Sequence, residues 1–129
     1  MNVMTQITQA AVLHCPENKI LLLRLPDGAW HFPGGRLQAR ELWEDGLRRE
    51  VKEETALTDF IVVSCLGVDN WMSETNKKPR YGVFFHCSVA STFVPTLSNE
   101  HRDYTWVGAG DSLECFEFHR PKIGEIVKK

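Results

Sequence analysis

Three glutamates crowd one short segment of the chain and border its apolar stripe. An apolar side chain at every fourth position predicts an amphipathic helix over residues 42–54, with the stripe made by Trp43, Leu47 and Val51. At about 100° per residue, Glu50, Glu53 and Glu54 fall on an arc roughly 100° wide beside this stripe. Like charges at this spacing repel by roughly 0.2–0.5 kcal/mol per pair, so the crowding needs an explanation.

Two interpretations of the acidic helix are open. A mixed-charge solvated face is the commoner one, and the fragment alone favours it. A cation site is the alternative, because carboxylates beside a buried stripe are disfavoured unless they are paired or coordinated. Oxygen-only clusters suit hard cations such as Mg²⁺ or Mn²⁺. Gly46 lies one turn earlier at a similar azimuth, and a glycine inside a helix often marks a close approach.

The rest of the chain is dominated by apolar, β-branched runs separated by turn residues. Strands are predicted at 5–15, 19–25, 58–68, 81–90 and 104–107, with an extended piece at 30–33 and loops at 71–80 and 98–103. Residues 112–118 and 122–128 are candidate helices on either side of Pro121. Strands with at least one clear helix indicate an α/β or α+β fold.

Length and charge limit the remaining possibilities. The 129 residues suit a single domain over 1–129, and a content of 43% hydrophobic and 25% charged residues is ordinary for a soluble protein. A net charge of −2 gives no reason to expect stable binding to nucleic acid or to an anionic membrane. With no basic leader and no apolar run near the ~20 residues that span a bilayer, we expect a cytoplasmic protein.

The residues upstream of the acids decide between the two interpretations. Gly35 is followed after five residues by Glu41, and after seven more by Arg49-Glu50-Val51-Lys52-Glu53-Glu54-Thr55-Ala56-Leu57. This spacing resembles the Nudix box: a glycine, a glutamate, then Arg-Glu-apolar-x-Glu-Glu-x-Gly-apolar. Every defining position matches except the last glycine, and the approach WHFPGG is similar to the family's usual lead-in.

The resemblance implies a fold and an activity. The fold is an α/β/α sandwich, a mixed β-sheet between helices. The activity is hydrolysis of a diphosphate linkage in a nucleoside diphosphate joined to a further group. Such a linkage repels nucleophiles through its own negative charge, so the reaction needs a divalent cation, Mg²⁺ or Mn²⁺, to neutralise the phosphates and acidify a bound water.

By matching positions, the resemblance also implies residue roles. Metal would be held by Glu50, Glu53 and Glu54 together with the carbonyl of Gly35. Glu50 or Glu53 would act as general base, and Arg49 would pair with an acid and orient it.

Other roles concern the loops around the box. Glu41 and Gly34 would support the turn from loop to helix. Glu100, in SNEHRDYTWV, resembles the position of an additional metal ligand or base, with an exposed loop acid as the alternative. His101, next to it, is expected to be an ordinary surface or loop histidine.

Two departures from the family pattern concern the ends of the helix. Ala56 replaces a glycine that would suit a left-handed cap, so the helix is expected to end differently. Leu42 and Trp43 stand where relatives often carry a capping Ser or Thr and a proline, so the usual N-cap hydrogen bond is expected to be missing or replaced.

Substrate recognition must come from outside the box. Aromatic side chains stack on bases and arginines grip phosphates, so the candidates are Arg24, Trp71, Arg80, Tyr81 and Phe85. The short chain favours nucleoside triphosphates, with dinucleoside polyphosphates and nucleotide sugars or ADP-ribose as alternatives. The competing functions are a non-catalytic Nudix module for ligand sensing or interaction, and an isomerase or glycosylase on the same fold. A monomer and a homodimer are both open.

Overall fold

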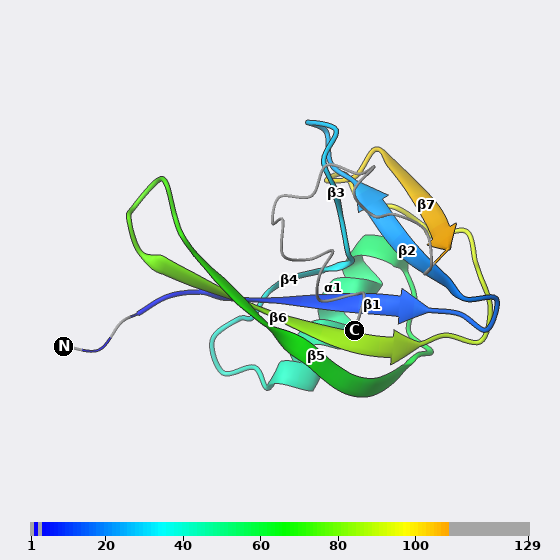
Figure 1. The fold of residues 1–129 in the computed structure, drawn as a ribbon, viewed down its shortest axis with the longest axis horizontal. Helices are drawn as coiled ribbons and strands as arrows, with labels where there is room; N and C mark the ends of the chain where they lie inside the picture. Colours follow the sequence, from blue (N-terminus) through cyan, green and yellow to red (C-terminus); the bar gives the residue numbers. More distant parts are fainter. Residues whose placement is uncertain (1, 3, 109–129) are drawn as a thin grey trace.

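A computed structural model describes residue 2 and residues 4–108 of the chain. One helix, α1 (Trp43–Thr55), lies among seven strands (Figure 1). The strands are β1 (Ile7–His14), β2 (Lys19–Arg24), β3 (Trp30–His31), β4 (Gly34–Arg36), β5 (Ile61–Met72), β6 (Pro79–Ser88) and β7 (Asp103–Gly108). No helix among these residues is long and apolar enough to cross a bilayer.

The strands form a mixed sheet in the order β3-β2-β1-β6-β5. Strands β1 and β6 run parallel from the Ile7–Tyr81 pair to the His14–Ser88 pair, and the other pairings are antiparallel. Strand β4 pairs with the first half of β1, while β7 pairs with β2. The pairing with β1 places Gly34 and Gly35 at the start of the sheet's central strand.

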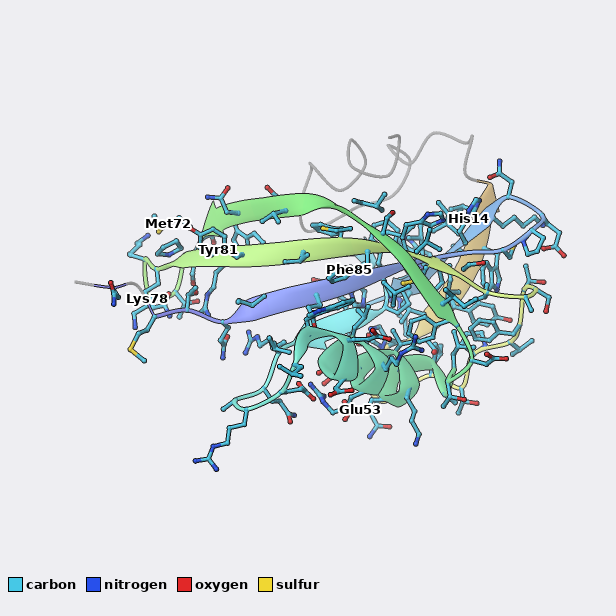
Figure 2. All side chains as sticks on the ribbon, turned by 90° about the horizontal axis from the view of Figure 1, so that it is seen from below. His14, Glu53, Met72, Lys78, Tyr81 and Phe85 are labelled. Atoms are coloured by element: carbon cyan, nitrogen blue, oxygen red, sulfur yellow. The ribbon has the colours of Figure 1, made fainter. Side chains whose placement is uncertain are left out.

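Helix α1 covers one face of the sheet, as the side view shows (Figure 2). Its Leu47 and Val51 are fully buried against apolar side chains of β1, β2 and β6, namely Ala11, Leu13, Leu21, Leu23, Phe85 and Cys87. A second cluster consists of Val12, Ile20, Leu22, Phe84 and Val107 from the strands, together with Phe32 from the link between β3 and β4. Both faces of the sheet are therefore apolar, as expected for a sheet buried on two sides.

The predicted helix and the strands β1, β2, β6 and β7 are confirmed to within a few residues. The predicted loop over 71–80 is wrong at both ends, because β5 continues to Met72 and β6 begins at Pro79. The two strands remain paired up to a short turn, whose Lys77 has a positive φ of 57°. The candidate helices at 112–118 and 122–128 lie outside the described residues.

The ends of α1 test two expectations. Leu42 is the N-cap residue and makes no side-chain capping hydrogen bond, as expected. Ala56 adopts a left-handed conformation (φ 67°) and its N–H donates to the Lys52 carbonyl at 2.8 Å. The helix therefore ends as a glycine cap would end it, and the expectation of a different ending is wrong. The backbone hydrogen bond holds Ala56 in a conformation that costs about 1–2 kcal/mol for a residue with a Cβ.

Candidate active site

The three box glutamates differ in burial although they share one helix. The exposed fraction of the side chain is 6% for Glu54, 17% for Glu50 and 56% for Glu53. Figure 2 shows Glu53 on the side of α1 away from the sheet. Together with Glu100, from the loop before β7, they line a cavity of about 330 Å³. Helix and loop thus bring four carboxylates around one small space.

At the two glycines before the helix, the chain backbone lies in contact with these acids. The Gly34 N–H donates to Glu54 Oε1 at 2.7 Å. A Cβ on Gly35 would overlap the Glu50 carboxylate, so a side chain at this position is incompatible with the acid's placement. The box glycine therefore leaves room for the Glu50 carboxylate against the β4 backbone.

Gly46 has the same function one turn earlier. A Cβ there would lie 2.6 Å from Leu37 Cδ1 and 2.8 Å from Glu41 Oε1. The close approach expected from a glycine in the helix is thus the approach of the loop that carries Glu41. Glu41 Oε1 also accepts the Gln38 N–H at 3.0 Å, so this carboxylate closes the turn that enters α1.

Arg49 links Glu41 to the acids of the helix. Its Nε and Nη2 donate to the two Glu41 oxygens at 2.7 and 3.0 Å. Its Nη1 donates to Glu50 at 2.7 Å and to Glu53 at 3.2 and 3.3 Å. One guanidinium therefore fixes three carboxylates, in the planar fork geometry that only arginine offers.

Burial and crowding raise the pKa values of two of the acids, whereas hydrogen bonds lower the pKa of a third. Burial raises the pKa of Glu54 to about 8, against the Gly34 hydrogen bond and assisted by repulsion from Glu50, Glu100 and Glu53. Burial also raises the pKa of Glu50, although Arg49 opposes this. Hydrogen bonds from Arg49 and the Gln38 backbone lower the pKa of Glu41 to about 2.

The balance of positive and negative side chains shows whether the site fits a divalent cation. Arg49 is the one cation bonded to the cluster within the described residues, against five carboxylates at Glu41, Glu50, Glu53, Glu54 and Glu100. A buried Glu54 with a pKa near 8 is mostly protonated at neutral pH unless positive charge is supplied. The excess of hard oxygen donors fits Mg²⁺ or Mn²⁺.

Two histidines complete the buried side of the site. His101 Nε2 lies 3.4 Å from Glu54 Oε2 and 2.6 Å from His31 Nε2, and its side chain is fully buried. Burial lowers the pKa of His101, which favours the neutral ring. His101 is a loop residue as expected, but it is not at the surface, because the loop brings its ring against His31 of β3 and Glu54 of α1. His31 was not among the predicted site residues.

A larger cavity of about 700 Å³ adjoins the acids and shares Glu54 and Glu100 with the smaller one. It lies over the sheet face opposite α1, where Ala10, Gly82 and Phe84 point. Trp71 and Phe32 add aromatic surface, and His31 lies at the wall. The site thus combines an acidic end with an aromatic compartment.

Of the five predicted substrate-binding residues, the structure places Trp71 in the larger cavity. The other four line neither cavity. Phe85 is in the core and stacks on Trp43, with ring centroids 4.9 Å apart, because alternate residues of β6 face α1 (Figure 2). Its neighbour Phe84 faces the cavity instead. Tyr81 shares the strand face of Phe85.

Two arginines from that set have other partners. Arg24 donates to the Gly28 carbonyl at 3.2 Å and lies over the Trp30 ring. Arg80 donates to Gln6 Oε1 at 2.9 Å near the far end of β5 and β6. Both arginines thus have partners that line neither the acidic nor the aromatic end of the site, and neither arginine lines a cavity.

Fold and site together describe a mixed sheet whose one described helix gathers carboxylates beside an aromatic cavity. A family model described as NUDIX domain matches residues 4–124, and the chain belongs to this family. It is a Nudix pyrophosphohydrolase, an enzyme of metal-dependent diphosphate hydrolysis.

Three proteins illustrate the similarity of this chain to known sequences and structures. The rat bis(5'-nucleosyl)-tetraphosphatase (asymmetrical) is 27% identical over 108 residues, which is 81% of this chain and 74% of the rat protein. A MutT protein from Methanosarcina mazei Go1 has a TM-score of 0.80 at 25% identity, over 99% of this chain and 94% of that one. A C. elegans Ap4A hydrolase has a TM-score of 0.78 at 19% identity, over 95% and 93% of the two chains.

Proposed function

We propose that this enzyme hydrolyses a nucleoside triphosphate at a diphosphate linkage, with Mg²⁺ or Mn²⁺ as the cation. The observation that carries the proposal is the junction of the two cavities at Glu54 and Glu100. A nucleotide has the matching parts, an aromatic base at one end and a chain of phosphates at the other.

The aromatic compartment supports recognition of the base. Trp71 and Phe84 lie near each other across Gly82, where a Cβ would be 3.2 Å from the indole and 3.6 Å from the Phe84 ring. Stacking on such surfaces contributes roughly 1–3 kcal/mol per base. A cavity of about 700 Å³ also lies within the usual size range for a small-molecule site.

The acidic end supports the cation. The residues that would hold it are Glu50, Glu53, Glu54 and Glu100, with the Gly35 carbonyl as a backbone ligand. When bound there, the cation supplies charge neutralisation of the phosphates and a lowered pKa for water.

The chain's own groups supply position and proton transfer. Arg49 holds Glu50 and Glu53 at 2.7 and 3.2 Å, which restricts the orientation of both carboxylates. Glu50 or Glu53 accepts the proton of the attacking water, and Glu50 is the better shielded of the two. General base catalysis contributes about 10²–10⁴-fold in rate. Glu41 positions Arg49 and thereby acts through it.

A second substrate class is favoured by the curated relative. The rat protein is a bis(5'-nucleosyl)-tetraphosphatase, and this chain is similar to it over most of its length. A substrate of that class would place one nucleoside in the aromatic cavity and leave the other outside it. Nucleotide sugars and ADP-ribose remain a third class.

A substrate panel tests the proposal. Purified protein with Mg²⁺ is incubated with the nucleoside triphosphates, diadenosine tetraphosphate, ADP-ribose and a nucleotide sugar, and products are identified by chromatography. A nucleoside monophosphate and pyrophosphate from a triphosphate are expected. Faster cleavage of diadenosine tetraphosphate would overturn the preference, and tight binding without turnover of any compound would indicate a non-catalytic module.

A further inference from the structure

The cluster of His31, Glu54 and His101 lies outside the set of acids on which the proposed mechanism depends, except for Glu54. The three residues come from β3, the last turn of α1 and the loop before β7. Their ligand atoms all lie within 4.8 Å of one another. Glu54 and His101 are buried and His31 is half-buried, so this is an internal constellation.

We propose that His31 Nε2, His101 Nε2 and Glu54 Oε2 form a mixed nitrogen–oxygen site for a first-row transition cation such as Mn²⁺, Co²⁺ or Zn²⁺. The proposal rests on the proposed function, since it assigns Glu54 a second set of partners. It differs in ligand chemistry from the all-oxygen site, because imidazole selects transition metals over Mg²⁺.

The orientation of each donor supports the assignment. Glu54 Oε1 is occupied by the Gly34 N–H at 2.7 Å, and Oε2 faces His101 at 3.4 Å. His101 Nδ1 lies 3.2 Å from Ser98 Oγ, which leaves Nε2 for the cluster. A partner on the remote nitrogen is the usual way in which a metal-binding imidazole is held in place.

The distance between the two imidazoles supports a shared ion. The Nε2 atoms are 2.6 Å apart, and the rings are stacked with an interplanar angle of 17°. A proton on one ring satisfies this contact. Two nitrogens at ~2.0–2.1 Å from a tetrahedral metal are about 3.3 Å apart, so a cation could replace the proton after a small displacement of His31.

The position of the site gives the cation access to substrate. His31 and Glu54 line the larger cavity, next to Glu100. A structural metal is enclosed by four protein ligands, whereas a site with three protein ligands keeps a position open. A transition cation held here would meet a phosphate between the aromatic compartment and the acids.

Mn²⁺ titration with pulsed electron paramagnetic resonance tests the proposal. When Mn²⁺ is added to metal-free protein without nucleotide, the bound ion is expected to show echo modulation from directly coordinated ¹⁴N. The modulation is expected to weaken in His31→Gln and in His101→Gln, and to disappear when both are replaced. It is expected to persist unchanged in His14→Gln, whose ring instead bonds Asn18 at 2.7 Å. The Kd for Zn²⁺, measured by competition with a chelator, is expected to rise at least about tenfold in His31→Gln.

The outcomes separate this proposal from the proposed function. Bound Mn²⁺ without ¹⁴N modulation, or modulation that survives both substitutions, would overturn the mixed site and identify the histidines as positioning residues for Glu54. Mg²⁺-dependent hydrolysis by the wild-type enzyme would still stand in that case. If His101→Gln does not fold, as judged by thermal melting, the half-buried His31→Gln decides alone.

Discussion

Arg49 and Glu41 form a two-point ion pair, with Nε to Oε2 at 2.7 Å and Nη2 to Oε1 at 3.0 Å. The pair joins the loop before α1 to the acidic face of the helix. Because the same guanidinium also holds Glu50 and Glu53, a change at Glu41 is transmitted to residues that would bind the cation.

Glu41→Gln should therefore lower kcat, although residue 41 does not itself contact the substrate. The amide retains one acceptor for Arg49 and loses the charge, so Glu50 and Glu53 become less well oriented. Partners of metal ligands typically contribute about 10–100-fold, and a decrease of that size is expected in steady-state assays. Glu44→Gln is the matched control, because Glu44 pairs with Arg48 at 2.9 Å on the exposed side of α1. Equal losses in the two variants would contradict the positioning role.

Trp71→Ala should weaken substrate binding more than chemistry. Loss of one stacking surface is worth roughly 1–3 kcal/mol, so KM is expected to rise about 5- to 150-fold with a smaller change in kcat. Tyr81→Ala is the control, since Tyr81 is on the same hairpin and lines neither cavity. An unchanged KM in Trp71→Ala would show that the base does not bind in the aromatic compartment.

The stability of the metal-free protein should fall as the pH rises from 6.5 to 8. The pKa of Glu54 is raised from 4.5 to about 8 in the folded state, so the folded protein retains a proton that the unfolded chain has already released. The free energy of unfolding then decreases by up to about 1.4 kcal/mol per pH unit. The lowered pKa of His101 acts below 6.5 and the lowered pKa of Glu41 acts below 4.5, so neither contributes in this window.

Urea denaturation in chelator at several pH values measures this slope. Glu54→Gln is expected to flatten it, because the amide does not titrate, and saturating Mg²⁺ is expected to stabilise wild type more at pH 8 than at pH 6.5. A slope that is the same in Glu54→Gln and in wild type would show that another group is responsible.

Ala56→Gly should stabilise the fold. The residue has a left-handed φ of 67°, which glycine adopts without the steric cost of a Cβ. A gain of about 1 kcal/mol, less the greater freedom of glycine in the unfolded chain, corresponds to a rise of a few degrees in Tm. Activity should be unchanged, because the Ala56 side chain lines neither cavity. A lower Tm would contradict the cap geometry.

The acidic centre could be predicted from the sequence because its spacing is local. Glu50, Glu53 and Glu54 lie on one helix, and the helical period alone places them together. Gly35, Glu41 and Arg49 follow from the box pattern at short range. Their mutual contacts in the structure agree with those expectations, whereas their chemical roles stay predictions.

The aromatic compartment could not be predicted in the same way. Whether Phe84 or Phe85 faces a cavity depends on the register of β6 against β1 and on two irregularities in β5. A shift of one residue reverses the faces of a strand, and nothing in the local pattern of two adjacent phenylalanines resolves this.

The two histidines illustrate long-range proximity. His31 and His101 are 70 positions apart, and they meet because β3 and the loop before β7 both flank β2. The one available signal was a titratable ring in the otherwise apolar stretch WHFPGG, directly before the box glycines. That signal singles out His31 but does not predict its contact with His101.

The central claim is that the carboxylates of α1 bind a cation that is required for cleavage of a nucleotide diphosphate linkage. Turnover of the best substrate in the panel, followed with Mg²⁺ for wild type, Glu53→Gln, Glu54→Gln and Glu44→Gln, tests it most directly. We expect several orders of magnitude less turnover in Glu53→Gln and Glu54→Gln with unchanged circular dichroism, near-normal turnover in Glu44→Gln, and none in wild type with EDTA. Near-normal turnover in Glu53→Gln or Glu54→Gln, or full activity in chelator, would contradict the claim.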